Sequence, residues 1–539
     1  MTNTQETNHF HLDKFLPPKG WRFLIIILLA IGIFFRFTNL DTKIYWLDET
    51  VTSLRLSGYS LQELDRSLYN NDDLISLWDL QKFQKVNSEK TINDSLQQLA
   101  RLEPQISPLY LILARFWSEW FGSSVAVIRS LSVLINFLIF PGIYWLCWEL
   151  FQSPTLSWMN VGLIAISPFH LLYAQEARHY SLWTVTILLS SAAFLRALRV
   201  KTTKSWVIYG MTMALNLYSN PLSILMGIMH SIYLLVIVGF RQKKILISYC
   251  FTWLGIIIGW MPWLWVIITN LKQAHKAVSW TEVNMTKYWL LKWFFENSIL
   301  SVIDITELRQ SNHKSIQIFC LISILAILGL IGYSIYFIVR NTSKKSWFFL
   351  VLLILFGGLI FLLLDLLFGG MRSQIPRYLI PYYLGINITV IIMIYHKLIS
   401  PISLERNLGR GLIVTLISLG IISCTIISQV ECSWSKEPSC DNITIARIIK
   451  KASHPLLVTN RFKTNIGQLF SLSYKLDSNV KFQLLKSSSK FQTPEGFSDI
   501  FLYNISPSLR EELARSRSFQ IQSVYQGKHL KLEKLVPPK

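Results

Sequence analysis

A polytopic α-helical membrane protein with a small α/β domain at its C-terminal end is the fold class that this sequence predicts. Of its 539 residues, 52% are hydrophobic and only 15% are charged, and they include 19 Trp, 21 Tyr and 32 Phe. This apolar excess is larger than a soluble core requires. The apolar residues gather in long runs as far as residue 429 and in short stretches beyond it.

Eleven apolar runs are predicted to be membrane-spanning helices. A span needs roughly 20 apolar residues, and its backbone polar groups must be paired within the segment, which a helix achieves. The first run lacks a small-residue cleavage site and is expected to be retained. The predicted spans are 22–39, 123–148, 157–174, 180–198, 206–219, 221–240, 246–269, 314–339, 346–367, 379–397 and 411–429.

A further apolar segment, SPLYLILARFWSEWF (107–121), is left out of this count. It is short, carries Arg115 and Glu119, and is amphipathic. These features favour a helix that lies in the membrane interface.

Lysine and arginine gather in four connections between the predicted spans: 196–204, 241–244, 340–345 and 397–410. By the positive-inside rule these connections are cytoplasmic, and they alternate correctly if the N-terminus is cytoplasmic. The turn 149–156 should share that side although it has no Lys or Arg. The net charge of +21 therefore belongs to membrane loops and does not indicate a nucleic-acid-binding module.

The remaining connections are predicted to be extracytoplasmic: 40–122, 173–181, 270–313, 368–378 and the tail 430–539. The loop 40–122 is acidic in its first half and should form short helices at the membrane surface. The tail alternates apolar stretches such as VKFQLL with helical patterns such as NITIARIIKKA, which predicts an α/β domain. The expected domains are thus 1–429 and 430–539.

Six cysteines divide between these two regions. Four lie in predicted spans and are expected to be packing residues: Cys147, Cys250, Cys320 and Cys424. Cys432 and Cys440 flank SWSKEPS in the tail, where an oxidising compartment permits a disulfide. Two cysteines do not fix a bond, so the sequence leaves this pairing open.

Ionisable residues cluster at the outer ends of several spans. Asp48 and Glu49 follow the first span in IYWLDETVTSLRL, and solvation is the ordinary interpretation of such a pair. Glu176, Arg178 and Tyr180 lie in QEARHYSLW, at the mouth between two spans. Unpaired charge is costly there, although interface anchors are an alternative interpretation.

Two further outer segments carry charge. Glu103 ends the acidic loop in LEPQISPLY, and Arg372, Arg377 and Tyr378 lie in GGMRSQIPRYLIPYY. Two arginines in an outer turn run against the inside preference of positive charge. Because guanidinium groups hold phosphate by forked hydrogen bonds, this turn is a candidate phosphate site.

Together these strings resemble the GT-C superfamily of membrane glycosyltransferases. Within it, the sequence is similar to the branch of protein O-mannosyltransferases and lipid A aminoarabinose transferases, glycosyltransferase family 39. The resemblance covers about residues 20–400 and rests on LDE, EPQISPLYLILARFW, AVIRSLSVL, SPFHLLYAQEARHYSL and PRYLIP. It implies transfer of a sugar from a polyprenyl-phosphate donor to a lipid, glycan or protein acceptor, at the outer face of a bacterial inner membrane.

The resemblance also implies residue roles. Asp48 matches the acidic residue proposed as general base, and Glu49 and Glu176 are the other catalytic candidates. The implied substrate-binding residues are Glu103, Arg129, Arg178, Tyr180, Arg372, Arg377 and Tyr378. These residue types suit the chemistry, because a glycosyl phosphate needs mainly a base for the acceptor and cations for the departing phosphate.

The sequence departs from its relatives at two histidine positions, where Gln105 and Asn220 stand. We therefore expect no cofactor and assign no metal ligands. His275 and Glu103 could pair as ligands, but they lack a spacing motif.

Two other functions remain open. A transporter or flippase of a lipid-linked saccharide would show internal repeats and charges near the bilayer midplane. No repeat is evident, and Asp365, the clearest buried acid, lies near a span end. A ligase or polymerase of surface polysaccharide would share the GT-C features, and no motif encodes the sugar, the acceptor or the oligomeric state.

Overall fold

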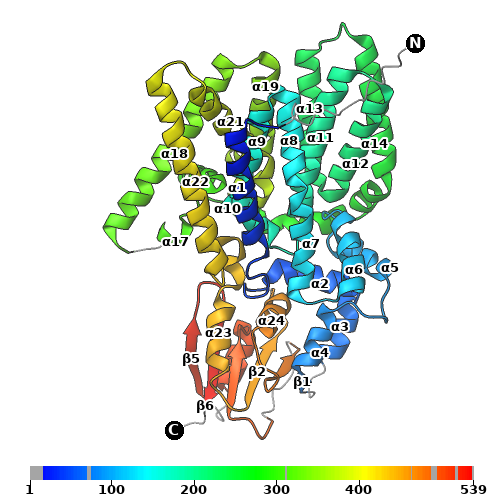
Figure 1. Cartoon of the computed structure of the whole chain (residues 1–539). Helices are drawn as coiled ribbons and strands as arrows, with labels where there is room; N and C mark the ends of the chain where they lie inside the picture. The colour runs from blue at the N-terminus through cyan, green and yellow to red at the C-terminus, as the bar shows by residue number, and fades with distance from the viewer. Residues whose placement is uncertain are drawn as a thin grey trace, which may run out of the picture.

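The computed structural model describes residues 16–69, 74–309, 312–462, 464–486, 494–515 and 520–536. Most of the N-terminal segment that we expect to be cytoplasmic lies outside these ranges. The molecule has three layers: a long helix bundle, a layer of short helices across one end of it, and a sheet domain beyond that layer (Figure 1).

Each of the eleven predicted spans is helical, and most ends lie within a few residues of the predicted ones. Eight described helices are long and apolar enough to cross a membrane, and a ninth results if the bent pair α9–α10 counts as one span. The other two, α12 and α13, are shorter. The bundle consists of α1 (Lys19–Phe37), α7 (Val125–Phe137) with α8 (Ile139–Phe151), α9 (Pro154–Ala165) with α10 (Pro168–Ala174), α11 (Tyr180–Val200), α12 (Thr203–Ser219), α13 (Ile224–Ile237), α14 (Lys243–Thr269), α18 (Lys314–Asn341), α19 (Lys344–Ile354) with α20 (Ile360–Phe368), α21 (Ile380–Leu398) and α22 (Ser403–Gln429).

Two spans are interrupted. The α9–α10 pair bends by 62° immediately before Pro168, which cannot continue the helix with a backbone N–H. A π-helical stretch, Leu355–Leu359, joins α19 to α20. There Gly357 lets α21 approach closely, since a Cβ at this position would lie 2.3 Å from the Tyr382 nitrogen.

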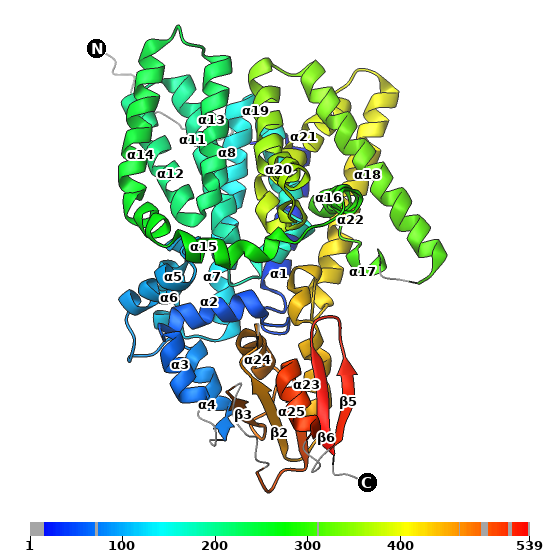
Figure 2. The same cartoon turned by 180° about the vertical axis from the view of Figure 1, so that it is seen from behind.

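The layer of short helices comes from the outer loops. The helices of these loops are α2 (Leu47–Ser57), α3 (Leu61–Leu68), α4 (Leu77–Gln81), α5 (Ile92–Leu102), α6 (Leu109–Phe121), α15 (Leu271–Val278), α16 (Lys287–Ser298) and α17 (Thr306–Arg309). Of these, α3 and α4 lie beside the sheet domain, and α16 lies beside α18 and α20 of the bundle (Figure 2). In both views α2 lies across the ends of the bundle helices, between them and the sheet domain (Figure 1 and Figure 2). The helix predicted at 107–121 is present as α6, and its interfacial position stays a prediction.

The sheet domain contains α23 (Asp441–Ile449), α24 (Asn465–Ser473) and α25 (Pro507–Arg515) around six strands in the order β1-β3-β2-β4-β6-β5. The strands are β1 (Ile75–Ser76), β2 (Pro455–Asn460), β3 (Lys481–Leu485), β4 (Asp499–Tyr503), β5 (Gln520–Gln526) and β6 (Lys531–Val536). β2 is parallel to β3 and β4, and the other pairs are antiparallel. β1 belongs to the first outer loop, so this loop completes the sheet of the tail.

The outer loop and the tail also share a hydrophobic core. Leu54 and Phe83 from the loop belong to the same buried cluster as Leu457 and Phe482 from the sheet. Helix α2 is therefore packed against the sheet domain as well as against the bundle.

Cys432 and Cys440 form a disulfide, which the sequence had left open. Of the span cysteines, Cys147, Cys320 and Cys424 are buried packing residues as predicted, whereas Cys250 is exposed on α14.

Candidate functional site

The paired carboxylates lie in the first turn of α2. The helix begins after Trp46 and ends at Gly58, whose φ of +81° is a left-handed conformation that glycine adopts without strain. Acidic groups in a first turn interact favourably with the helix dipole. Neighbouring helical positions point in different directions, so the Asp48 side chain is 24% exposed and the Glu49 side chain is fully buried.

Glu49 is the centre of a buried ionic cluster. Its Oε1 accepts hydrogen bonds from Arg129 Nε at 2.8 Å and from the Ala177 N–H at 2.8 Å. Its Oε2 accepts from Arg129 Nη2 at 2.6 Å and from Lys436 Nζ at 2.9 Å. Burial by itself would raise the pKa of Glu49, but Arg129 and Lys436 outweigh it and lower the pKa. Glu49 is therefore an ionised and fully paired carboxylate.

Arg129 uses all five of its N–H donors inside this cluster. Besides the two bonds to Glu49, it donates to the carbonyls of Leu40, Lys43 and Ile44 at 2.6, 3.1 and 2.8 Å. Arg129 thereby ties α7 to the segment that leads into α2.

Glu176 lies on the other side of the same cluster and is fully buried. Its Oε1 accepts from Ser435 Oγ at 2.7 Å and lies 4.0 Å from Lys436 Nζ. Its Oε2 has no hydrogen-bond partner within the described ranges. Burial raises the pKa of Glu176, with Lys436 opposing the shift.

Asp48 faces the opposite way, toward two arginines. Its Oδ2 lies 3.7 Å from Nη2 of Arg377, whose side chain is 18% exposed. Arg178 donates to the Asp48 carbonyl at 3.3 Å and to Thr52 Oγ1 at 2.9 Å. One guanidinium group therefore lies beside the Asp48 carboxylate, and the other lies against the backbone of the same residue.

Arg377 is held by aromatic rings and makes no hydrogen bond within the described ranges. Its guanidinium lies 5.7 Å from the ring centre of Trp46, 5.6 Å from that of Trp280 and 5.9 Å from that of Tyr378. Cation–π contacts orient the group and leave its N–H donors available. Tyr180 has the corresponding role beside Arg178, with its ring centre 5.8 Å from that guanidinium.

The other two candidates, Glu103 and Arg372, are each paired with another side chain. Glu103 accepts from Arg55 Nε at 3.0 Å and lines a small pocket with Arg178 and His179. Arg372 donates to Asp365 Oδ1 at 3.1 Å and to the Gly369 carbonyl at 2.9 Å.

The sequence-predicted residues thus fall into two adjoining groups. Asp48, Arg178, Tyr180, Arg377 and Tyr378 form one group, which we call the outer group, and Asp48 and Arg377 are partly exposed in it. Glu49, Arg129 and Glu176 form the buried cluster behind it. Glu103 adjoins the outer group through Arg178, and Arg372 faces Asp365.

Three residues of these groups escaped the sequence analysis. Trp46 and Trp280 enclose Arg377, and Lys436 enters the buried cluster from the tail. Tryptophans near a membrane are ordinarily assigned to the interface, and a lysine in a tail loop is ordinarily solvated. His275 lies 3.3 Å from Glu282, and no group of three or more possible metal ligands was found in the described part of the chain.

The fold of this chain is similar to that of ArnT in two solved structures. The crystal structure of ArnT from Cupriavidus metallidurans bound to undecaprenyl phosphate matches with a TM-score of 0.55 and 12% identity, over 96% of this chain and 98% of that chain. Its apo state matches with a TM-score of 0.52 and 11% identity over the same shares. No protein-family model and no curated protein sequence matches the chain.

Proposed function

We propose that this chain is a membrane glycosyltransferase that moves a sugar from a polyprenyl-phosphate donor to an acceptor at the outer face of a bacterial inner membrane. One observation carries the proposal: the accessible Asp48 carboxylate faces Arg377, whose N–H donors have no hydrogen-bond partner among the described residues. A base for the acceptor and a forked cation for the donor phosphate therefore lie beside each other. The ArnT structure that holds undecaprenyl phosphate supports a lipid carrier of this class.

The reaction follows from this geometry. The acceptor hydroxyl oxygen attacks the anomeric carbon, its proton passes to Asp48, and the bond between the sugar and the phosphate oxygen breaks. Arg377 and Arg178 receive the negative charge that develops on the leaving phosphate. Cations aimed at that charge stabilise the transition state more than the ground state.

The buried cluster has a supporting part in this proposal. Glu49 is fully paired, so we assign it to holding α2 rather than to proton transfer. Arg129 has no free donor for a phosphate and holds the segment before α2. Glu176 completes the cluster, and Tyr180 and Tyr378 orient the two arginines.

The proposal is tested with Asp48→Asn and Arg377→Lys in proteoliposomes supplied with radiolabelled polyprenyl-phosphate sugars. Asp48→Asn should lower turnover at least about a hundredfold, the low end for positioned acid–base catalysis. It should leave binding of undecaprenyl phosphate unchanged. The exposed Asp41, a few residues upstream, provides the control Asp41→Asn, which should behave as wild type.

Arg377→Lys keeps the charge but loses the planar fork, so undecaprenyl phosphate should bind at least about tenfold more weakly. Arg372→Ala should have a smaller effect, because Arg372 is already bonded to Asp365. Full turnover by Asp48→Asn would refute the base assignment. Movement of intact donor across the bilayer without sugar transfer would favour a flippase.

A further inference from the structure

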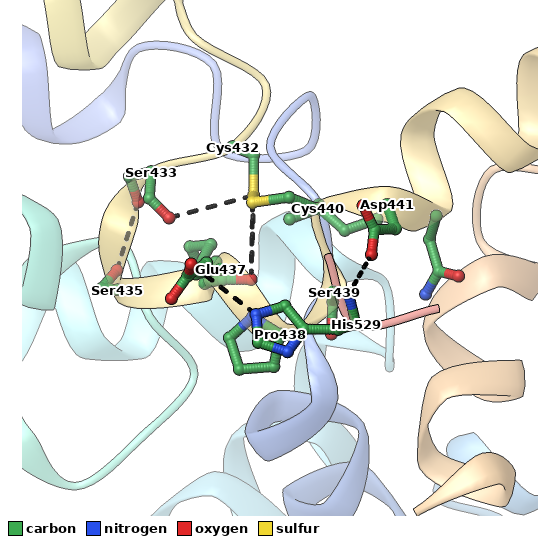
Figure 3. Close-up of a disulfide and its surroundings, with 12 residues drawn as sticks. Cys432, Ser433, Ser435, Glu437, Pro438, Ser439, Cys440, Asp441 and His529 are labelled. Atoms are coloured by element: carbon green, nitrogen blue, oxygen red, sulfur yellow. Dashed lines mark hydrogen bonds and ion pairs between the residues drawn. A yellow bond between two sulfur atoms is a disulfide. The ribbon is translucent and has the colours of Figure 1, made fainter. Parts of the chain in front are cut away.

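The disulfide closes a short loop at the start of the tail, residues 432–440, which we call the cystine loop. Figure 3 shows its two cysteines joined above a turn of 3-10 helix, with Ser433, Ser435 and Ser439 projecting from the loop. The residue before the loop is bonded to the segment that leads into α2, since the Ile44 N–H donates to the Glu431 carbonyl at 2.8 Å.

Lys436 projects from this loop into the buried cluster, and its side chain is only 1% exposed. Its ammonium lies 2.9 Å from Glu49 Oε2 and 4.0 Å from Glu176 Oε1. The two cations of the cluster, Arg129 and Lys436, balance the negative charge of its two carboxylates, Glu49 and Glu176. Without Lys436, Glu49 would keep Arg129 as its one bonded cation and Glu176 would lose the ammonium that lies 4.0 Å away, which is costly in a low-dielectric environment.

The cystine loop also holds the first turn of α2 directly. The Leu47 N–H, which has no partner within its own helix, donates to Ser439 Oγ at 3.0 Å. One turn later, Thr50 Oγ1 donates to the Gly467 carbonyl at 3.0 Å. Asp48 lies between these two contacts, so the tail fixes the backbone on both sides of the proposed base.

We propose that Lys436 is a positioning residue for Asp48, and that the disulfide keeps the cystine loop in the shape that places Lys436 beside Glu49. The inference rests on the proposed function and adds that Asp48 is held in place only when the tail is docked. Lys436 acts through Glu49, the helical neighbour of Asp48, and touches no substrate. Its loss should therefore slow the chemical step more than it weakens donor binding.

The test measures turnover and undecaprenyl phosphate affinity for Lys436→Met, Lys436→Arg and the double variant Cys432→Ser/Cys440→Ser in the full-length protein. Lys436→Met should lower kcat about tenfold to a hundredfold, the scale expected of a misplaced catalytic group, while affinity for undecaprenyl phosphate stays unchanged. Lys436→Arg keeps the charge and should recover part of the lost kcat. The cysteine double variant should lower kcat with the same unchanged affinity.

The matched control is Lys475→Met. Lys475 also ties the tail to the segment before α2, through a bond to the Thr42 carbonyl at 2.6 Å, but it contacts no buried carboxylate. It should keep wild-type kcat. If Lys436→Met does not fold, the inference is tested by the kcat and the undecaprenyl phosphate affinity of Lys436→Arg.

Wild-type kcat in a folded Lys436→Met protein would overturn the inference, and so would a parallel loss of kcat and affinity. Wild-type kcat in the cysteine double variant would overturn the role of the disulfide. Asp48→Asn measured alongside separates this result from the proposed function, because an active Asp48→Asn protein refutes the base assignment whatever Lys436 does.

Discussion

Asp48 and Glu49 are adjacent in α2, yet the Asp48 carboxylate is partly exposed beside Arg377 and the Glu49 carboxylate lies in a closed ionic cluster. Consecutive helical side chains diverge, so only one of the two can face Arg377. The partners of Glu49 come from α7 and from the tail, which are far from it in sequence. A carboxylate in such a cluster stabilises the fold only as long as it stays ionised.

This dependence predicts how stability changes with pH. The pKa of Glu49 falls from its ordinary value of 4.5 to about 2 in the folded protein, so its contribution is complete above pH 4.5 and is lost as pH falls toward 2. Glu49→Gln breaks a buried pair and should cost about 3–5 kcal/mol at pH 7. The difference in Tm between wild type and this variant should narrow from pH 5 to pH 3, as measured by thermal unfolding in detergent.

Glu511→Gln is the control for this measurement, because Glu511 forms an exposed pair with Arg515 at 3.8 Å. Exposed pairs contribute about 0–1 kcal/mol, so its Tm should follow that of wild type at each pH. A constant Tm difference for Glu49→Gln across the range would contradict the ionic role.

The sequence indicated most residues of the proposed site but not how they are arranged. Charge at a span boundary indicated Asp48, Glu176 and Arg178, and the misplaced positive charge indicated Arg377. Nothing local distinguishes Glu49 from Asp48, or the bonded Arg372 from Arg377, because their surroundings come from distant segments. Lys436 had no sequence signal, since its burial depends on the docking of the tail.

The interrupted α9–α10 span is stabilised by an arginine of α1. The bend leaves carbonyl oxygens without helical partners, and such groups need substitutes inside a membrane. Arg36, fully buried, donates to the Ala165 carbonyl at 2.5 Å and to the Ile164 carbonyl at 3.3 Å. The apolar runs and Pro168 were readable from the sequence, but the donors that stabilise the bend were not, because they come from another helix.

The close approach of α1 to the bend gives an element-scale prediction. A Cβ on Gly32 would lie 2.4 Å from the Ala165 oxygen, and a backbone atom cannot move aside cheaply. Gly32→Ala should therefore displace α1 and cost about 1–3 kcal/mol, the usual range for overpacking. Gly255→Ala in α14 is the matched control, since a Cβ there meets nothing within 4 Å. Equal thermal stability of the two variants in detergent would show that α1 does not need this contact.

At the scale of the whole molecule, the charged connections at one end of the bundle all indicate the same orientation of the protein in the membrane. The turn 149–156 carries no Lys or Arg, but Glu149 at its start pairs with Arg199 through bonds of 2.8 and 2.9 Å. Arg199 belongs to the basic connection 196–204. The turn 149–156 and the basic connection thus lie at the same end of the molecule, opposite the sheet domain (Figure 2).

This arrangement predicts that the basic connections are cytoplasmic and that the sheet domain is on the other side of the membrane. Green fluorescent protein fused after residue 204, 244 or 345 should fluoresce, because positive loops are retained inside. Alkaline phosphatase fused after residue 539 should be active, because the tail follows α22 out of the membrane and its disulfide requires an oxidising compartment. The same fusions with the reporters exchanged serve as controls and should be inactive. An active phosphatase at 204, 244 and 345 together with a fluorescent C-terminus would invert the topology and place Asp48, Arg377 and the lipid phosphate that they are proposed to bind at the cytoplasmic face.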